Sequence, residues 1–184
     1  GGGEGETPGR REGEAMKPAL KLLFIAYPPG VDPLFEAVVN ALLPDPSYKT
    51  FRVRSAKEIV SRTYSQSMYY RVEQVDVLAH GSPGLCKLGT GAVVFDALSS
   101  TFNLGGLHAH LAPDAEVRFL ACRVASAAGV ANASWVYEPK RALQWLKARL
   151  GQRKVLAAKD DIYARDFGPT GFLDSSAPKL LASG

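Results

Sequence analysis

Apolar residues in this chain fall into short runs with the length of β-strands, and segments with helical spacing lie between them. The run at residues 21–27 is continuous, as expected for a strand buried on both faces of a sheet. The run at residues 48–55 alternates apolar and polar positions, which predicts a strand with one face in water. Three further runs, at residues 75–81, 115–122 and 154–159, complete the predicted strands.

Helical spacing of apolar residues predicts four helical segments between these strands. The first has Asp32 in the N-cap position and Pro33 at the first helical position, which is a favourable start for a helix. The third is expected to be mainly helical, with a break at Gly105-Gly106. The four segments are residues 32–43, 56–63, 95–112 and 139–151.

Three other stretches complete the pattern. Residues 85–89 and 92–98 flank a Gly-Thr-Gly sequence, which favours a small β-hairpin. Residues 64–74 give no clear signal, and the chain from Asp160 onward is rich in loop-forming residues.

The alternation of strands and helices predicts an α/β fold in which a mostly parallel sheet is covered on both faces, as in a three-layer sandwich. The 184 residues suit one domain with a sizeable core, which we expect to span residues 17–184. Residues 1–16 are rich in Gly, Glu and Arg, and we expect them to be a disordered tail or residues added to the natural chain.

Composition and charge say little about which molecules the protein binds. The net charge of +4 permits an anionic partner. Basic residues are not interleaved with aromatic ones as in a groove for single-stranded nucleic acid, so we expect no nucleic-acid partner. The apolar run from Leu22 to Tyr27 is short for a signal peptide and for a membrane span, so we expect no membrane span. Cellular location and oligomeric state stay open.

Two cysteines, Cys86 and Cys122, are too few for a disulfide framework, and they cannot form a structural zinc site without histidines. A single disulfide between them is left open. The sequence has neither of the glycine-rich nucleotide-binding motifs, G-x-x-x-x-G-K and G-x-G-x-x-G, and it lacks the G-x-S-x-G motif of serine hydrolases. We therefore expect neither a nucleotide-dependent enzyme nor a serine hydrolase, and no cofactor.

Two predicted strands end on residues suited to thiol chemistry. The strand at 75–81 ends on His80-Gly81, and the strand at 115–122 ends on Cys122. Carboxyl ends of neighbouring parallel strands share one rim of the sheet, where α/β proteins bind ligands. If the two strands are neighbours, His80 and Cys122 point at the same rim. A thiolate is the nucleophile of cysteine catalysis, and a nearby imidazole activates it or transfers protons.

Each of these residues also has a purely structural interpretation. Free cysteine is among the most buried residue types, and a histidine at a strand end can cap a loop. Gly81 can be an ordinary turn residue, or it can let the backbone approach a substrate and offer its N–H to an oxyanion. The small residues Ala79 and Ala121 leave room at the rim.

The sequences "LAHG" and "LAC" resemble the caspase–legumain–gingipain superfamily of cysteine peptidases. "LACRV" is similar to the caspase signature Q-A-C-[RQG]-G, with Leu120 in place of Gln and Val124 in place of the last Gly. The stretch from Val75 to Ala125 looks closer still to an uncharacterised bacterial domain family with an H-G-S-P-G motif, which occurs in large surface proteins. Self-processing domains of large bacterial toxins are more distant relatives.

The resemblance implies a caspase-like fold and a cysteine endopeptidase that acts on a protein or peptide. Cys122 would be the nucleophile and His80 the general acid/base, with the backbone N–H groups of Gly81 and Cys122 holding the oxyanion. In this superfamily the pair acts as a dyad, so no third orienting acid is expected. The alternatives are a catalytically silent binding module on the same fold and a self-processing domain of a longer precursor.

The resemblance also suggests a specificity. Relatives that cut after basic residues carry an acidic residue two positions before the nucleophile, where this chain has Leu120. Alternate residues of a strand share a face, so Leu120 and Cys122 are expected to look toward the same region. We therefore expect an apolar or small substrate residue on the amino side of the cut bond.

Other polar residues are expected to be bystanders. His108 and His110 lack the spacing of a zinc site and are expected on a helix surface, so no metal site is predicted. Cys86 is expected in a hairpin beside the cleft. Three aspartates after the last predicted strand are expected in solvated loops, with a specificity pocket or a calcium site as alternatives: Asp160, Asp161 and Asp166.

Overall fold

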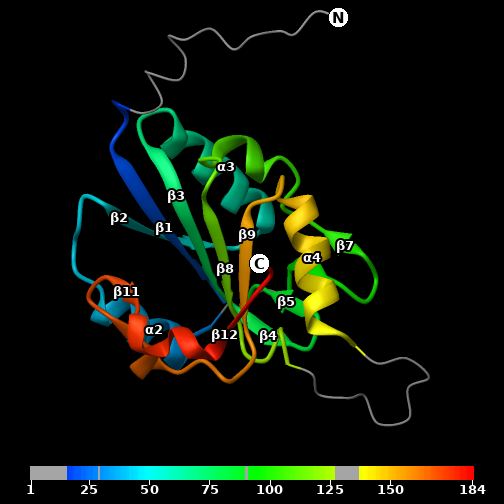
Figure 1. The fold of residues 1–184 in the computed structure, drawn as a ribbon. Coiled ribbons are helices and arrows are strands. Elements are labelled where there is room, and N and C mark those ends of the chain that lie inside the picture. The colour runs from blue at the N-terminus through cyan, green and yellow to red at the C-terminus, as the bar shows by residue number, and fades with distance from the viewer. Residues whose placement is uncertain (1–15, 29, 90, 127–136) are drawn as a thin grey trace, which may run out of the picture.

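The five predicted strands and one further strand form a six-stranded central sheet in a computed structural model, which describes residues 16–28, 30–89, 91–126 and 137–184 (Figure 1). From edge to edge the strands are β2 (Tyr48–Val53), β1 (Ala19–Ala26), β3 (Arg71–Leu78), β8 (Glu116–Leu120), β9 (Lys154–Ala158) and β12 (Leu180–Ala182). The first five are parallel, and β12 pairs antiparallel with β9. The mixed α/β fold with a mostly parallel sheet is thus confirmed.

Burial explains the continuous apolar run in β1. In β1, every residue from Leu22 to Ala26 is fully buried, because both faces of the strand are covered. The tail expected at residues 1–16 lies outside the described residues apart from Met16. No helix in the described part of the chain is long and apolar enough to cross a membrane.

Helices cover both faces of the sheet (Figure 1). One face carries α2 (Pro33–Ala41), the short 3-10 helices η2 (Ala164–Asp166) and η3 (Asp174–Lys179), and the small hairpin of β10 (Phe167–Gly168) and β11 (Gly171–Phe172). The other carries α3 (Ala56–Ser67), the 3-10 helix η1 (Leu107–His110) and α4 (Pro139–Arg149). This arrangement is compatible with the expected three-layer sandwich.

Local signals in the sequence explain where the helices begin. The carboxylate of Asp32 accepts hydrogen bonds from Leu34 N and Phe35 N, so this residue caps α2 as predicted. The hydroxyl of Ser55 accepts from Glu58 N and caps α3. The helix α3 continues to Ser67, four residues beyond the predicted end, and the helix predicted at 139–151 is α4.

The helix expected over residues 95–112 is wrong for most of its length. The segment contributes to a four-stranded antiparallel sheet in which β4 is His80–Ser82, β5 is Leu85–Lys87, β6 is Val93–Asp96 and β7 is Thr101–Phe102. Phe95 pairs with Phe102 across β6 and β7, and its ring meets Phe119 of β8 edge-on, with centroids 4.8 Å apart. The Asp96 carboxylate accepts from Leu98 N, a bond that favours a turn over a helix.

The hairpin expected around Gly-Thr-Gly is confirmed, since β5 and β6 pair antiparallel. The sequence pattern did not predict β12 or the β10–β11 hairpin, which lie in the loop-rich part after Asp160. These elements have two or three residues per strand, too few for a periodic signal.

Candidate active site

The strands β3 and β8 are neighbours, as the catalytic hypothesis requires. Leu78 of β3 pairs with Leu120 of β8, and Ala79 N donates a hydrogen bond to Leu120 O at 3.4 Å. The two strands end at Leu78 and Leu120, so His80 is the first residue of β4 and not the end of β3 as expected. Two residues beyond the last pair, the chain reaches His80 after β3 and Cys122 after β8, at the carboxyl rim of the sheet. The backbones of neighbouring strands lie about 4.8 Å apart.

The side chains of both residues lie on the side of the sheet that α2 covers. The imidazole of His80 lies against Phe35 of α2, with ring centroids 4.9 Å apart. The sulfur of Cys122 contacts Ile162, which comes just before η2. The helices α2 and η2 are themselves in contact, so the structure brings the two predicted site residues to one side of the sheet. Among the described residues, however, their polar contacts are with other groups and not with each other.

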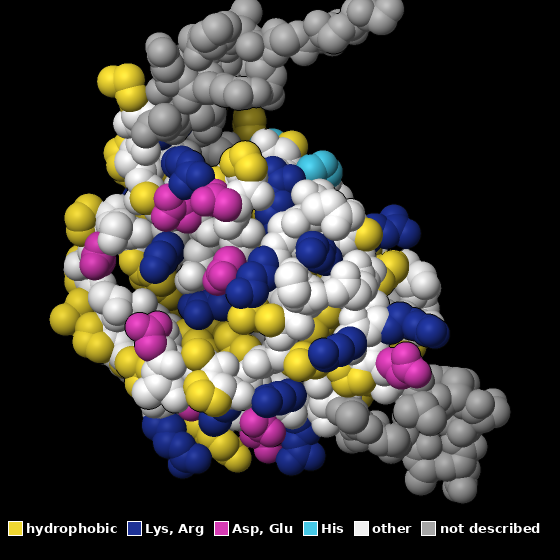
Figure 2. Space-filling model, viewed as in Figure 1, with side chains coloured by type: hydrophobic (Ala, Val, Ile, Leu, Met, Phe, Trp, Pro, Cys, Tyr) yellow, Lys and Arg dark blue, Asp and Glu magenta, His cyan; other side chains and the backbone are white. Residues whose placement is uncertain are grey.

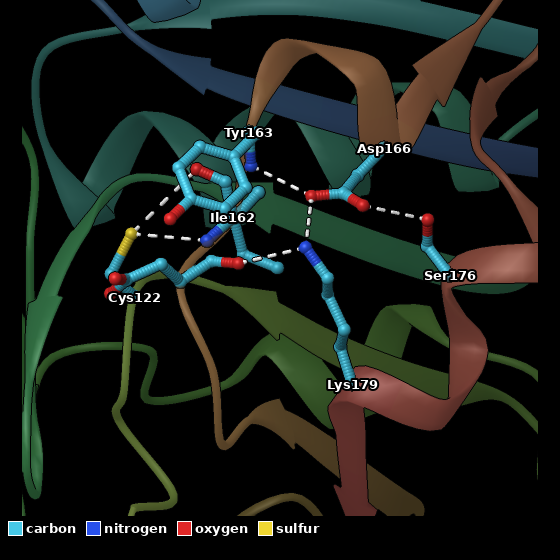
Figure 3. Close-up of polar contacts among 7 residues, drawn as sticks. Cys122, Ile162, Tyr163, Asp166, Ser176 and Lys179 are labelled. Carbon is cyan, nitrogen blue, oxygen red and sulfur yellow. Dashed lines mark hydrogen bonds and ion pairs between the residues drawn. The ribbon is translucent and has the colours of Figure 1, made fainter.

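The Cys122 side chain is partly exposed, and its sulfur meets the backbone of Ile162 (Figure 3). Ile162 N donates a hydrogen bond to Sγ at 3.3 Å, and Sγ lies 3.8 Å from Ile162 O. The backbone N–H places positive partial charge against the sulfur, which is the kind of surrounding that a reactive cysteine needs.

The loop that presents Ile162 is fixed by the buried carboxylate of Asp166 (Figure 3). This carboxylate accepts hydrogen bonds from Tyr163 N at 2.7 Å, Ser176 Oγ at 2.7 Å and Lys179 Nζ at 2.8 Å. Burial opposes ionisation of Asp166, but the hydrogen bonds from Lys179, Tyr163 N and Ser176 outweigh it, so the pKa of the carboxyl lies below its ordinary value. The loop therefore has a charged internal anchor.

His80 has a partner that the sequence did not reveal. Its Nε2 lies 2.9 Å from Oδ2 of Asp32, the residue that caps α2. The His80 side chain is 53% exposed, whereas that of Asp32 is 18% exposed. The contact joins the loop after β1 to the end of β3, two neighbours in the sheet. The sequence predicted that Asp32 caps a helix, but nothing in the sequence indicated its contact with His80.

Gly81 lies directly against the backbone that follows β8. A Cβ at this position would lie 2.7 Å from Cys122 O and 2.7 Å from Val124 Cγ2, so a larger residue forces the two strand ends apart. Gly81 therefore closely approaches the backbone of Cys122. The approach to a substrate that the sequence suggested stays a prediction. The oxyanion roles of the Gly81 and Cys122 N–H groups stay predictions.

The second cysteine is a core residue. Cys86 is fully buried and pairs with Gly81 across β4 and β5. Burial raises the pKa of the Cys86 thiol, which keeps it protonated and unreactive. Both cysteines are free, so no disulfide joins them. Leu120 is also fully buried beneath the rim, and its role in substrate binding stays a prediction.

A charged hollow of about 430 Å³ is lined by Arg123, the residue after Cys122, and by the loop after β9, whereas Cys122 itself is not one of its lining residues. The Arg123 guanidinium makes a two-pronged contact with the Asp161 carboxylate, at 2.9 and 3.1 Å. Asp160 is exposed at the hollow, whereas Asp166 is buried behind it. Figure 2 shows Lys and Arg side chains, with Asp and Glu between them, at the lower end of the molecule, where the parallel strands finish. The hollow is lined by Arg123, Ser126, Lys159, Asp160, Asp161, Tyr163, Arg165 and Lys179.

The remaining histidines lie away from this rim. His108 and His110 belong to η1, and His110 lies against Tyr64 of α3 with ring centroids 5.0 Å apart. Within the residues that the structure covers, no group of three or more His, Cys, Asp or Glu side chains is placed to hold a metal ion.

Sequence reasoning found the pair at the strand ends but missed Asp32 and Ile162 as parts of the site. A backbone N–H, such as that of Ile162, leaves no mark in a sequence, and the side chain of Asp32 was already explained by its helix cap. Comparison with known proteins adds no assignment, since no family model matches the chain and no curated protein matches it.

Proposed function

We propose that this chain is a cysteine endopeptidase with a caspase-like fold. The observation that carries the proposal is the register of β3 and β8, which brings an exposed imidazole and a partly exposed thiol to neighbouring strand ends. The mostly parallel sheet with helices on both faces supports the fold, and the burial of Cys86 leaves Cys122 as the nucleophile.

The reaction proceeds by acyl transfer. The Cys122 thiolate attacks the carbonyl carbon of the scissile peptide bond, and a C–S bond forms as negative charge moves to the carbonyl oxygen. Backbone N–H groups of Gly81 and Cys122 stabilise that oxygen. The C–N bond then breaks, and the imidazolium of His80 gives its proton to the leaving amine. Water attacks the thioester with His80 as base, which releases the acid and restores the thiol.

The charged hollow lined by Arg123, the residue after Cys122, is large enough to receive part of a peptide. Its lining has both cationic and anionic side chains, which can bond to the C=O and N–H groups that a polypeptide carries along its backbone. The fixed loop between β9 and η2 forms one wall of this hollow and holds the sulfur through Ile162 N. A protein or peptide substrate is therefore the natural partner for the site.

The test combines a peptide library with a cysteine-directed covalent probe, both read by mass spectrometry. We expect the purified wild type to cleave peptides, and Cys122→Ala to lose about 10³-fold or more of that activity with an intact fold. Iodoacetamide should label Cys122 well before Cys86, and His80→Ala should slow that labelling because the thiolate is the reactive form. Cys86→Ala is the matched control, since it removes the other thiol and should leave Cys122 labelling unchanged.

The outcomes separate the candidate functions. Faster labelling of Cys86, or unchanged labelling in His80→Ala, contradicts the assignment of the pair. Cleavage restricted to the chain's own flanking sequences narrows the activity to self-processing. A wild type inactive on every peptide, in each activating condition tried, overturns the peptidase and leaves the binding module.

A further inference from the structure

The two carboxylate oxygens of Asp32 have different partners. Oδ1 accepts hydrogen bonds from Leu34 N at 3.0 Å and Phe35 N at 3.4 Å, in the first turn of α2. Oδ2 lies 2.9 Å from His80 Nε2. The helix therefore holds the carboxylate in place by one oxygen while the other faces the imidazole.

His80 needs such a partner because packing alone does not fix its ring. Its side chain is 53% exposed, and its aromatic contact is with Phe35 on one side, at an interplanar angle of 41°. The contact of Nε2 with Asp32 restricts the rotation of the ring. It also leaves Nδ1 as the nitrogen for proton transfer, since no described residue is hydrogen-bonded to Nδ1.

We propose that Asp32 is a positioning residue for the proposed peptidase, which holds the His80 ring in one orientation. The inference rests on the proposed function, because it assigns Asp32 a part in the same reaction. When His80 takes up a proton, the carboxylate 2.9 Å away becomes the counter-ion of the imidazolium. Asp32 thereby turns the expected pair of residues into a set of three, drawn from the segments that follow β1, β3 and β8.

The test compares two substitutions that both keep a helix cap. Asparagine and serine cap helices about as well as aspartate, so Asp32→Asn and Asp32→Ser should both preserve α2. Asparagine keeps an oxygen that can accept from Nε2, but it removes the charge. Serine is too short to reach the ring. Asp45→Asn is the matched control, because Asp45 also accepts from a backbone N–H two residues on, that of Ser47.

In the peptide assay we expect Asp32→Ser to lower kcat by about 10- to 100-fold with little change in KM, since a misplaced general acid affects the transition state more than binding. Asp32→Asn should fall between Asp32→Ser and the wild type. Asp45→Asn should retain wild-type kcat. A loss of activity that merely follows a loss of thermal stability in each variant overturns the proposal.

A second measurement does not depend on activity. NMR should show close proton contacts between the His80 and Phe35 rings in the wild type, where the ring centroids are 4.9 Å apart. These contacts should weaken in Asp32→Ser, because serine no longer holds the imidazole in one orientation. Ring contacts that are identical in Asp32→Ser and the wild type overturn the role of Asp32. Weakened contacts in a protein without peptidase activity refute the proposed function alone and leave the positioning role standing.

Discussion

Replacing Lys179 with methionine should destabilise the protein, because it removes the cation from a buried carboxylate. The Asp166 side chain is 4% exposed, and Lys179 supplies one of its three hydrogen bonds at 2.8 Å. The Lys179 ammonium also donates to Asp161 O at 3.0 Å. Breaking a fully buried ion pair costs about 3–5 kcal/mol, and the two donors that Asp166 keeps reduce this. We therefore expect the free energy of unfolding to fall by about 2–3 kcal/mol at neutral pH.

The pH dependence of this loss gives a second check. The pKa of Asp166 is depressed in the folded protein, so its contribution to stability is fully present above the ordinary aspartate pKa and disappears as the pH falls through the folded value. The difference between Lys179→Met and the wild type should thus be largest at neutral pH and shrink below about pH 4. Urea unfolding at a series of pH values measures it.

Lys159→Met is the control for Lys179→Met, because Lys159 lines the same hollow with an exposed side chain. It should change stability by less than about 0.5 kcal/mol. Hydrogen exchange at Ile162 N should become faster in Lys179→Met alone, since the loop has lost its anchor. Equal stability of Lys179→Met and the wild type at neutral pH, or a difference that persists in acid, would refute this reasoning.

Two further predictions concern the strand ends and the choice of substrate. Gly81→Ala should lower the free energy of unfolding by about 1–3 kcal/mol, because its Cβ meets Cys122 O at 2.7 Å, whereas Gly105→Ala, with nothing within 4 Å, should have no such effect in thermal unfolding. A fully stable Gly81→Ala contradicts the close packing of the strand ends. Peptide cleavage should occur after apolar or small residues, because Asp161 and Asp166 are already paired with cations, and a buried unpaired Lys or Arg of the substrate costs several kcal/mol. Sequencing of the cleavage sites decides this, and a majority of cuts after Arg or Lys contradicts it.

The central strands could be predicted because their burial leaves short runs of mainly apolar residues in the sequence. The runs at 21–27, 75–81 and 115–122 correspond to β1, β3 and β8, and their ends gave His80 and Cys122. The helix over 95–112 failed because Phe95 and Phe102 are spaced as a helix would space them but pair across two short strands. In the folded protein Phe95 packs against Phe119 of β8. Phe119 lies 24 residues further along the chain, so the local sequence around Phe95 does not reveal this contact.

The supporting part of the site could not be predicted for a different reason. In the sequence, the role of Asp32 as the N-cap of α2 is enough to explain why an aspartate stands there. Its contact with His80 therefore leaves no additional signal in the sequence. Ile162 contributes a backbone group, and any residue type except proline supplies the same N–H. Lys179 and Ser176 reach Asp166 from a segment without periodicity. Tertiary contacts alone give these residues their roles.

The parallel arrangement of β1, β3 and β8 also determines how the site comes into being during folding. Parallel neighbours need long crossover connections, and Asp76 and Arg118, which pair across β3 and β8, are 42 residues apart. Cys122 and Ile162 are separated by 40 residues. Closing such long loops lowers the entropy of the chain before the contacts stabilise the fold. The contacts therefore form slowly. A fragment that lacks β1 or β9 therefore lacks part of the site, and the thiol acquires its surroundings only when the sheet as a whole has assembled.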